Sequence, residues 1–247
     1  FALRAHFEQK YAAPVWIDND VNLMALGEAA VNTDAKNQEL LYIKIGTGIG
    51  AGIISHNLIH RGAQGSAGDI GHIAISEPTT IVCRCGNIGC LEAVAGGGAL
   101  ARDAKVAVEE NKSTFLADRL KKNKILTGKD VTDGARSGDA WSVDAVSQAG
   151  RHIGRVLATI INFYNPSVVV IGGGVSRAGN LLLASIRETI YRRSLPLATR
   201  DLEIRIGDAK EEVGLRGAAE MVLTELFSPD LLGQWGDKGK PVLPVSY

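Results

Sequence analysis

All three cysteines of the 247-residue chain lie within eight positions of one another, at Cys83, Cys85 and Cys90. His72 stands eleven residues before the first of them. Three thiols and one imidazole are the number and kind of ligands that a tetrahedral structural Zn²⁺ site takes. The glycines at 86 and 89 allow the tight turns that bring sulfurs together. We therefore predict a zinc site formed by His72, Cys83, Cys85 and Cys90.

Other interpretations of the cysteines carry less weight. A disulfide framework is disfavoured because three cysteines leave one thiol over after any pairing, and Cys83 and Cys85 are too close in sequence to pair comfortably. Three unrelated thiols in a glycine-rich loop is a second alternative. A lone histidine is more often a hydrogen-bonded structural residue than a ligand, so His72 is the least certain member of the set. Reduced thiols suit a cytoplasmic protein.

The charge balance and apolar content of the chain exclude several classes of protein. Lys plus Arg and Asp plus Glu both number 27, so the chain lacks the basic field of a nucleic-acid-binding domain. No apolar run reaches the roughly 18 residues that a membrane span requires. We expect a globular cytoplasmic protein that makes no membrane contact.

The two halves of the chain differ in their periodicity. In the first half we expect strands at 14–17, 40–45, 50–55, 58–60 and 73–75, and helices at 1–11 and 21–31. In the second half we expect helices at 99–110, 113–122, 139–164, 179–193 and 213–227, and strands at 168–171 and 204–206. The succession of strand, glycine loop and helix from 168 to 193 is an α/β unit.

Two glycine-rich segments lie beside expected strands. Gly46, Thr47 and Gly48 join two strands, and the glycines at alternate positions let the backbone approach a ligand closely. Gly173 and Gly174 follow a strand at its carboxyl end, where open α/β sheets bind nucleotides. Each segment is a candidate phosphate contact, and a plain tight turn is an equal alternative for each.

Five short polar side chains are candidates for binding a polyhydroxylated ligand: Asn19, Asp20, Asp69, His72 and Glu92. The pair at 19 and 20 lies where a strand gives way to a helix, so its simplest role is to cap that helix. An aspartate at such a position can also accept a proton from a hydroxyl nucleophile while an asparagine amide fixes neighbouring hydroxyls.

These segments together resemble a known family. Asn19-Asp20 and the motifs at 46–52, 68–72 and 83–92, in that order, resemble the ROK family of bacterial sugar kinases and transcriptional repressors (repressor, open reading frame, kinase). The residues at 172–174 and 214–219 extend the resemblance to about residue 227. It implies an α/β fold of the actin-like ATPase (ribonuclease H-like) class, with a sugar in the cleft between two lobes.

The resemblance also implies roles for individual residues. Asp20 matches the catalytic base of the kinases, and Asn19, Glu92 and His72 match sugar contacts, with His72 using one ring nitrogen for zinc and the other for the sugar. The segments containing Gly46, Thr47, Gly48, Gly173 and Gly174 correspond to phosphate and adenosine contacts. Asp69 stands where many members have Glu, so this sugar contact is expected to differ.

Residues 1–32 are expected to be a remnant of the small N-terminal lobe and 33–227 the large lobe with the sugar and zinc sites. Helix 213–227 either stays with the large lobe or returns to the small one, and 228–247 form a polar tail. Because the chain begins at Phe1 inside an expected helix, we expect it to be a piece of a longer protein whose fold is incomplete at the N-terminus.

The resemblance implies one of two functions, a sugar kinase or a sugar-sensing repressor. The kinases carry an Asp-x-Gly-x-Thr phosphate loop near their start, and no such segment occurs in this sequence. The ATP site is therefore expected to be incomplete in this chain. Asp69, the tail at 228–247 and the start at Phe1 favour the sugar-sensing, zinc-containing region of a repressor, expected to dimerise, to bind a monosaccharide or amino sugar, and to contact DNA only through a part absent from this chain. The alternative is a fragment of an ATP- and Mg²⁺-dependent glucokinase-like enzyme with Asp20 as base, inactive as it stands. A folded domain that binds neither sugar nor nucleotide is the third possibility.

Overall fold

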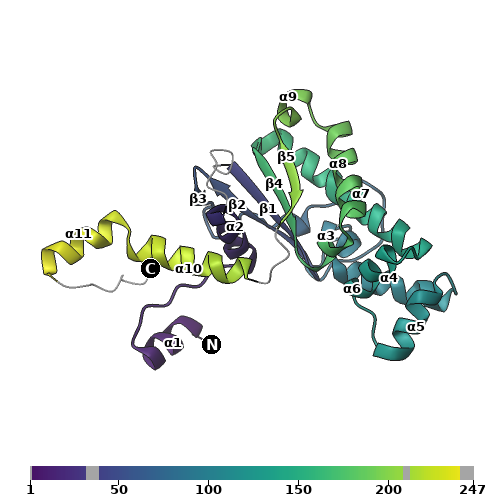
Figure 1. Ribbon diagram of the computed structural model, residues 1–247, viewed down its shortest axis with the longest axis horizontal. Helices are drawn as coiled ribbons and strands as arrows, with labels where there is room; N and C mark the ends of the chain where they lie inside the picture. The colour runs from purple at the N-terminus through teal and green to yellow at the C-terminus, as the bar shows by residue number, and fades with distance from the viewer. Residues whose placement is uncertain (1, 32–38, 208–211, 240–247) are drawn as a thin grey trace.

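The computed structural model of the chain describes residues 2–31, 39–207 and 212–239 (Figure 1). Its sheet consists of β1 (Glu39–Ile45), β2 (Ile49–Ser55), β3 (Leu58–Ile59), β4 (Val168–Gly172) and β5 (Glu203–Ile206). The strands stand in the order β3-β2-β1-β4-β5. β2 is antiparallel to β1 and β3, whereas β4 is parallel to β1 and β5. The predicted α/β class is confirmed.

Helices cover both faces of the sheet (Figure 1). α2 packs on one face and α10 packs on α2, while α7 and α8 share the larger core with the other face. α3, α4 and α6 pack against α7, and α5 packs against α6. The helices are α1 (Leu3–Tyr11), α2 (Asp20–Val31), α3 (Leu91–Ala95), α4 (Gly97–Glu109), α5 (Thr114–Asn123), α6 (Gly128–Arg136), α7 (Ala140–Tyr164), α8 (Asn180–Arg193), α9 (Pro196–Thr199), α10 (Val213–Leu226) and α11 (Pro229–Lys238), with the 3₁₀ helices η2 (Ile70–His72) and η3 (Gly174–Ala178).

β1 is buried on both faces, as its nearly continuous apolar sequence requires. Leu40 and Tyr42 belong to the cluster beneath α2, and Leu41 and Ile43 belong to the larger cluster shared with α7 and α8. Each of the four side chains is at most 2% exposed. This central position fixes the carboxyl end of β1, where the glycine turn begins.

α2 and α10 cross in close contact because glycines stand at the crossing. A Cβ atom on Gly217 would lie 1.7 Å from the carbonyl oxygen of Leu23, and one on Gly27 would lie 1.9 Å from that of Val213. Any larger residue would force the helices apart. Residues 20–31 are thereby packed between the sheet and α10, and the expected lobe boundary after residue 32 stays a prediction.

The structure differs from the expected elements in several places. No strand forms at 14–17, where Pro14 lacks a backbone N–H and no strand of the described ranges pairs with the segment. The expected strand at 73–75 contributes only one isolated bridge, between Ala74 and Cys90. α3 and α6 were not expected, and part of the expected tail forms α11, which projects away from the sheet with α10 (Figure 1). Residues 240–247 of the tail lie outside the described ranges.

Of the helices in the described ranges α7 is the longest, and neither it nor any other has the apolar length that a bilayer span requires.

Candidate functional site

A cleft of about 480 Å³ opens where the amino end of α2, the turn between β1 and β2, and the loop before η2 meet. Four of the five predicted sugar-binding residues line it: Asn19, Asp20, Asp69 and Glu92. The predicted phosphate residues Gly46, Thr47 and Gly48 line it too. The structure thus brings together side chains that come from segments more than 70 residues apart in sequence. We call this the first cleft.

A buried carboxylate holds the segment that presents Asn19 and Asp20. Asp18 Oδ1 accepts hydrogen bonds from the backbone N–H of Asn19 and from Asn22 Nδ2, each at 2.7 Å, and its Oδ2 pairs with Arg61 Nε. Asn19 Oδ1 in turn accepts from the N–H of Val21 at 3.1 Å, so it also helps to cap α2. Asp18 was missed in the sequence, although it directly precedes the two residues that were predicted.

Asp20 is the first residue of α2 and its side chain is 63% exposed. Its Oδ2 accepts a hydrogen bond from Lys44 Nζ, at the carboxyl end of β1. Lys44 was also missed. The available signal was a single charged residue inside the otherwise apolar run 40–45, immediately before the glycine turn.

Asp69, His72 and Glu92 link the first cleft to the cysteines. His72 Nε2 lies 3.8 Å from Asp69 Oδ1, and its other ring nitrogen, Nδ1, lies 3.6 Å from Cys83 Sγ. Glu92, near the start of α3, accepts hydrogen bonds from Cys83 Sγ at 3.6 Å and from Arg84 Nη2 at 3.4 Å. Of the predicted sugar contacts among the described residues, His72 alone does not line the cleft. It stands behind Asp69, between the cleft and the cysteines.

The ligand atoms of His72, Cys83, Cys85 and Cys90 all lie within 4.8 Å of one another. Cys85 Sγ and Cys90 Sγ are 3.6 Å apart, as are Cys83 Sγ and His72 Nδ1. An ion about 2.3 Å from sulfur and about 2.0 Å from nitrogen holds tetrahedral ligands roughly 3.5–3.8 Å apart. The cluster could therefore bind a metal ion, and its donors and spacing fit zinc.

The thiols of the cluster differ in their surroundings. Burial raises the pKa of Cys90 to about 12, and hydrogen bonds from the neighbouring thiols act in the same direction. A backbone hydrogen bond from Asn87 lowers the pKa of the exposed Cys85. A bound cation would stabilise all three as thiolates, so metal binding would release protons.

A second cleft, of about 520 Å³, shares Lys44, Gly46 and Thr47 with the first. Its other walls include the predicted residue Gly174 and the amino ends of α4 and α6. Gly173 does not line it but shapes the turn after β4, where it has φ = 87° and where a Cβ atom would lie 2.5 Å from Ile45 O. The two predicted glycine segments therefore do meet, with Lys44 and Thr47 between the clefts.

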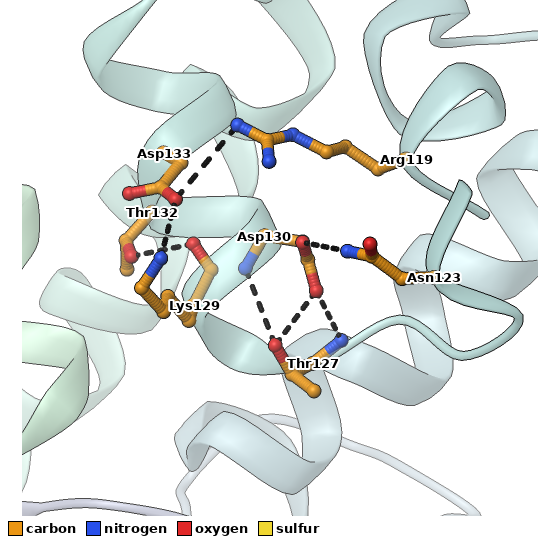
Figure 2. Close-up of polar contacts among 7 residues, drawn as sticks. All are labelled: Arg119, Asn123, Thr127, Lys129, Asp130, Thr132 and Asp133. Atoms are coloured by element: carbon orange, nitrogen blue, oxygen red, sulfur yellow. Dashed lines mark hydrogen bonds and ion pairs between the residues drawn. The ribbon is translucent and has the colours of Figure 1, made fainter.

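Figure 2 shows the hydrogen bonds that hold the α6 wall of the second cleft. Thr127 Oγ1 accepts from the N–H of Asp130, whose carboxylate accepts from the N–H of Thr127 at 2.9 Å, a capping box. Asn123 Nδ2 also donates to Asp130, and Asp133 accepts from Lys129 Nζ at 3.0 Å. The Thr-x-x-Asp pattern at 127–130 was the sequence signal that could have revealed α6.

Comparison with known proteins identifies the group to which these features belong. A family model described as "ROK family" matches residues 1–225. The chain belongs to the ROK family. It is 37% identical over 222 residues to a glucokinase of Halalkalibacterium halodurans, covering 90% of this chain and 67% of that protein. It is 34% identical to a xylose repressor of Caldicellulosiruptor bescii, covering 92% and 56% respectively.

A solved ROK family transcriptional regulator, described as a homologue of the E. coli MLC protein, superposes with a TM-score of 0.78 at 30% identity. The match covers 89% of this chain and 54% of that one. The predicted actin-like ATPase fold is thereby confirmed. The chain spans about one half to two thirds of the length of these ROK relatives, which include both kinases and repressors.

Proposed function

We propose that the chain is the sugar-binding effector region of a ROK transcriptional repressor. The observation that carries the proposal is the first cleft, where Asn19, Asp20, Asp69 and Glu92 converge around a space large enough for a monosaccharide. Carboxylates and amides at the wall of such a cleft accept and donate hydrogen bonds to several hydroxyl groups at once. Relatives named for glucose and xylose support a sugar as the ligand class.

In this proposal zinc is a structural ion held by His72, Cys83, Cys85 and Cys90. It would tie the cysteine loop to His72 and so fix Asp69 and Glu92 at the edge of the first cleft. When one nitrogen of an imidazole binds a metal ion, a hydrogen bond from the other ring nitrogen to a carboxylate commonly fixes the orientation of the ring. The proposed homodimer, and DNA binding through a part of the protein outside this sequence, rest on the likeness to ROK repressors.

A kinase is the second candidate, because the Gly46–Thr47 turn separates a sugar-sized cleft from one lined by glycines and lysines. In that case Asp20 would be the base, and ATP with Mg²⁺ would occupy the second cleft. The sequence lacks the Asp-x-Gly-x-Thr loop of the kinases. We therefore propose that this chain by itself transfers no phosphoryl group.

Titration calorimetry tests the proposal, with glucose, xylose, mannose and N-acetylglucosamine as ligands. One or more should bind the wild type, and Asp20→Ala should weaken that binding at least tenfold. Asp201→Ala is the control, since Asp201 is exposed and pairs only with Arg200 among the described residues. The absence of binding to any of the sugars would contradict a sugar-binding function. Phosphorylation of a bound sugar in the presence of ATP and Mg²⁺ would contradict the assignment as a repressor fragment.

A further inference from the structure

Lys44 occupies an unusual position among the charged groups of the two clefts. Among the described residues that line the first cleft, three are carboxylates, Asp20, Asp69 and Glu92, and Lys44 is the one basic residue. The same lysine lines the second cleft. It therefore stands in the wall that the two clefts share.

The sheet explains how the lysine reaches this place. In the β-sheet register Lys44 is opposite Gly50 on β2 and Gly172 on β4, so glycines flank it on both sides. Leu40 and Tyr42, at alternate positions of the same strand, pack beneath α2. Lys44 leaves the sheet on that same face, where the amino end of α2 presents Asp20.

The ammonium group of Lys44 pairs with the carboxylate of Asp20. Lys44 Nζ donates to Asp20 Oδ2, while the side chain of Lys44 is only 30% exposed, and a Cβ atom placed on Gly46 would lie 3.4 Å from its Cε. One carboxylate oxygen is thus held by the lysine. None of the described residues bonds to the other oxygen, Oδ1, which can accept a hydrogen bond from a ligand in the cleft that Asp20 lines.

We propose that Lys44 is a positioning residue that fixes the Asp20 carboxylate as the acceptor for a sugar hydroxyl, and that this arrangement selects an uncharged sugar over its phosphate ester. The inference rests on the proposed sugar-binding function. The charges of Asp20, Asp69, Glu92 and Lys44 sum to −2, and Arg84, which pairs with Glu92, brings the sum to −1. A phosphate entering beside Asp20 would still meet a net negative charge at close range, because Lys44 and Arg84 are each already paired with a carboxylate.

A double-mutant cycle on the full chain tests the positioning role. With the sugar that the wild type binds most tightly, Lys44→Met should raise Kd about tenfold, the effect expected when a charge-assisted hydrogen bond to a binding group is lost. If Lys44 acts through Asp20, the double variant Lys44→Met/Asp20→Asn should bind no more weakly than Asp20→Asn alone. Lys44→Arg should restore most of the affinity, since it keeps the charge. Lys121→Met, an exposed lysine on α5, is the matched control and should bind as the wild type does.

Different results would overturn the positioning role, the selectivity and the proposed function. Wild-type Kd values for Lys44→Met, or losses that multiply in the double variant, would overturn the positioning role while leaving the sugar site intact. Tighter binding of a sugar 6-phosphate than of the parent sugar would overturn the selectivity and assign Lys44 to the phosphate. If the wild type binds no sugar at all, the proposed function fails and this inference fails with it. Circular dichroism and thermal unfolding of each variant show that a lost affinity is not a lost fold.

Discussion

Arg61 Nε donates a 2.7 Å hydrogen bond to Asp18 Oδ2, and this ion pair ties the segment after β3 to the residues that precede α2. The side chain of Asp18 is only 7% exposed, whereas that of Arg61 is 40% exposed. Asp18 also accepts from Asn19 and Asn22, so one buried carboxylate holds three donors. The conformation in which Asn19 and Asp20 meet the first cleft therefore depends on a residue that does not itself line the cleft.

Asp18→Ala should destabilise the chain by about 3 kcal/mol, because a buried acceptor of charge-assisted hydrogen bonds is removed and the N–H of Asn19 is left without it. Urea unfolding measures this loss. Because the Arg61 side chain is 40% exposed, water can solvate its guanidinium group once Asp18 is removed. The loss of stability should therefore lie at the lower end of the range for breaking a buried ion pair. Asp201→Ala, at an exposed pair, should change stability by less than about 0.5 kcal/mol. Equal stability of the two variants would show that Asp18 does not organise the segment.

Gly217→Ala should destabilise the chain by about 3 kcal/mol, because the added methyl group would overlap the backbone of α2 and separate the two helices. Gly214→Ala is a matched control on the same helix. The nearest atom to its added Cβ is Met24 Cγ at 3.9 Å, so alanine should be neutral or stabilise by up to about 1 kcal/mol through its helix propensity. Thermal and urea unfolding of the pair would reveal the difference, and equal values would refute close packing of α2 on α10.

The sequence was informative where one local pattern determines one structure. The apolar run of β1, the glycine turn after it and the long amphipathic α7 all occur within three residues of their expected bounds. The ordered motifs also predicted that Asn19, Asp20, Asp69 and Glu92 would meet, and they line one cleft. Their roles in binding stay predictions.

What the sequence did not reveal depends on long-range contacts. The segment expected as a strand at 14–17 has suitable residues, but none of the described strands pairs with it, and strand formation requires a partner. Asp18 looks like an ordinary polar residue until Arg61, 43 positions away, is placed beside it. Lys44 is a single charged residue in the otherwise apolar run 40–45, and its role depends on a contact with Asp20 that the sequence alone does not show. α6, with two glycines in nine residues, is stabilised by its capping box and by packing against α7.

Native mass spectrometry should find one zinc ion per chain, and Cys90→Ser should abolish its binding. The variant should lose roughly 10 °C in Tm, since a loss of about 3 kcal/mol corresponds to about 2–4 °C per kcal/mol in a chain of this size. Sugar affinity should fall in parallel, because His72 would no longer be fixed beside Asp69. A chelator should lower the Tm of the wild type toward that of Cys90→Ser and leave the variant unchanged. Metal-free wild type with an unchanged Tm would contradict a structural metal site.

Lowering the pH should destabilise the chain through His152, a buried residue of α7. Burial lowers the pKa of His152, and the charges of Arg155 and Arg151 add to this effect, while Glu77 opposes it. In the unfolded chain His152 takes up a proton near its ordinary pKa of about 6.5. In the folded chain it is still neutral at that pH, because its pKa is lower. The contribution of neutral His152 to the free energy of unfolding is therefore fully present above about pH 6.5. It decreases as the pH falls below that value and stops changing once the pH is below the pKa of His152 in the folded chain.

The measurement is the free energy of unfolding of wild type and His152→Gln between pH 7.5 and 5.5, both saturated with zinc. The wild type should lose more stability over this interval than His152→Gln does, because only its unfolded state gains a proton at position 152. His60→Gln, at an exposed position after β3, should retain the wild-type slope. All titrating groups other than residue 152, the metal ligands included, are common to wild type and His152→Gln, so the difference in slope between these two proteins reports His152. Identical slopes for wild type and His152→Gln would mean that the imidazole takes up its proton equally well in the folded chain, with Glu77 compensating for burial.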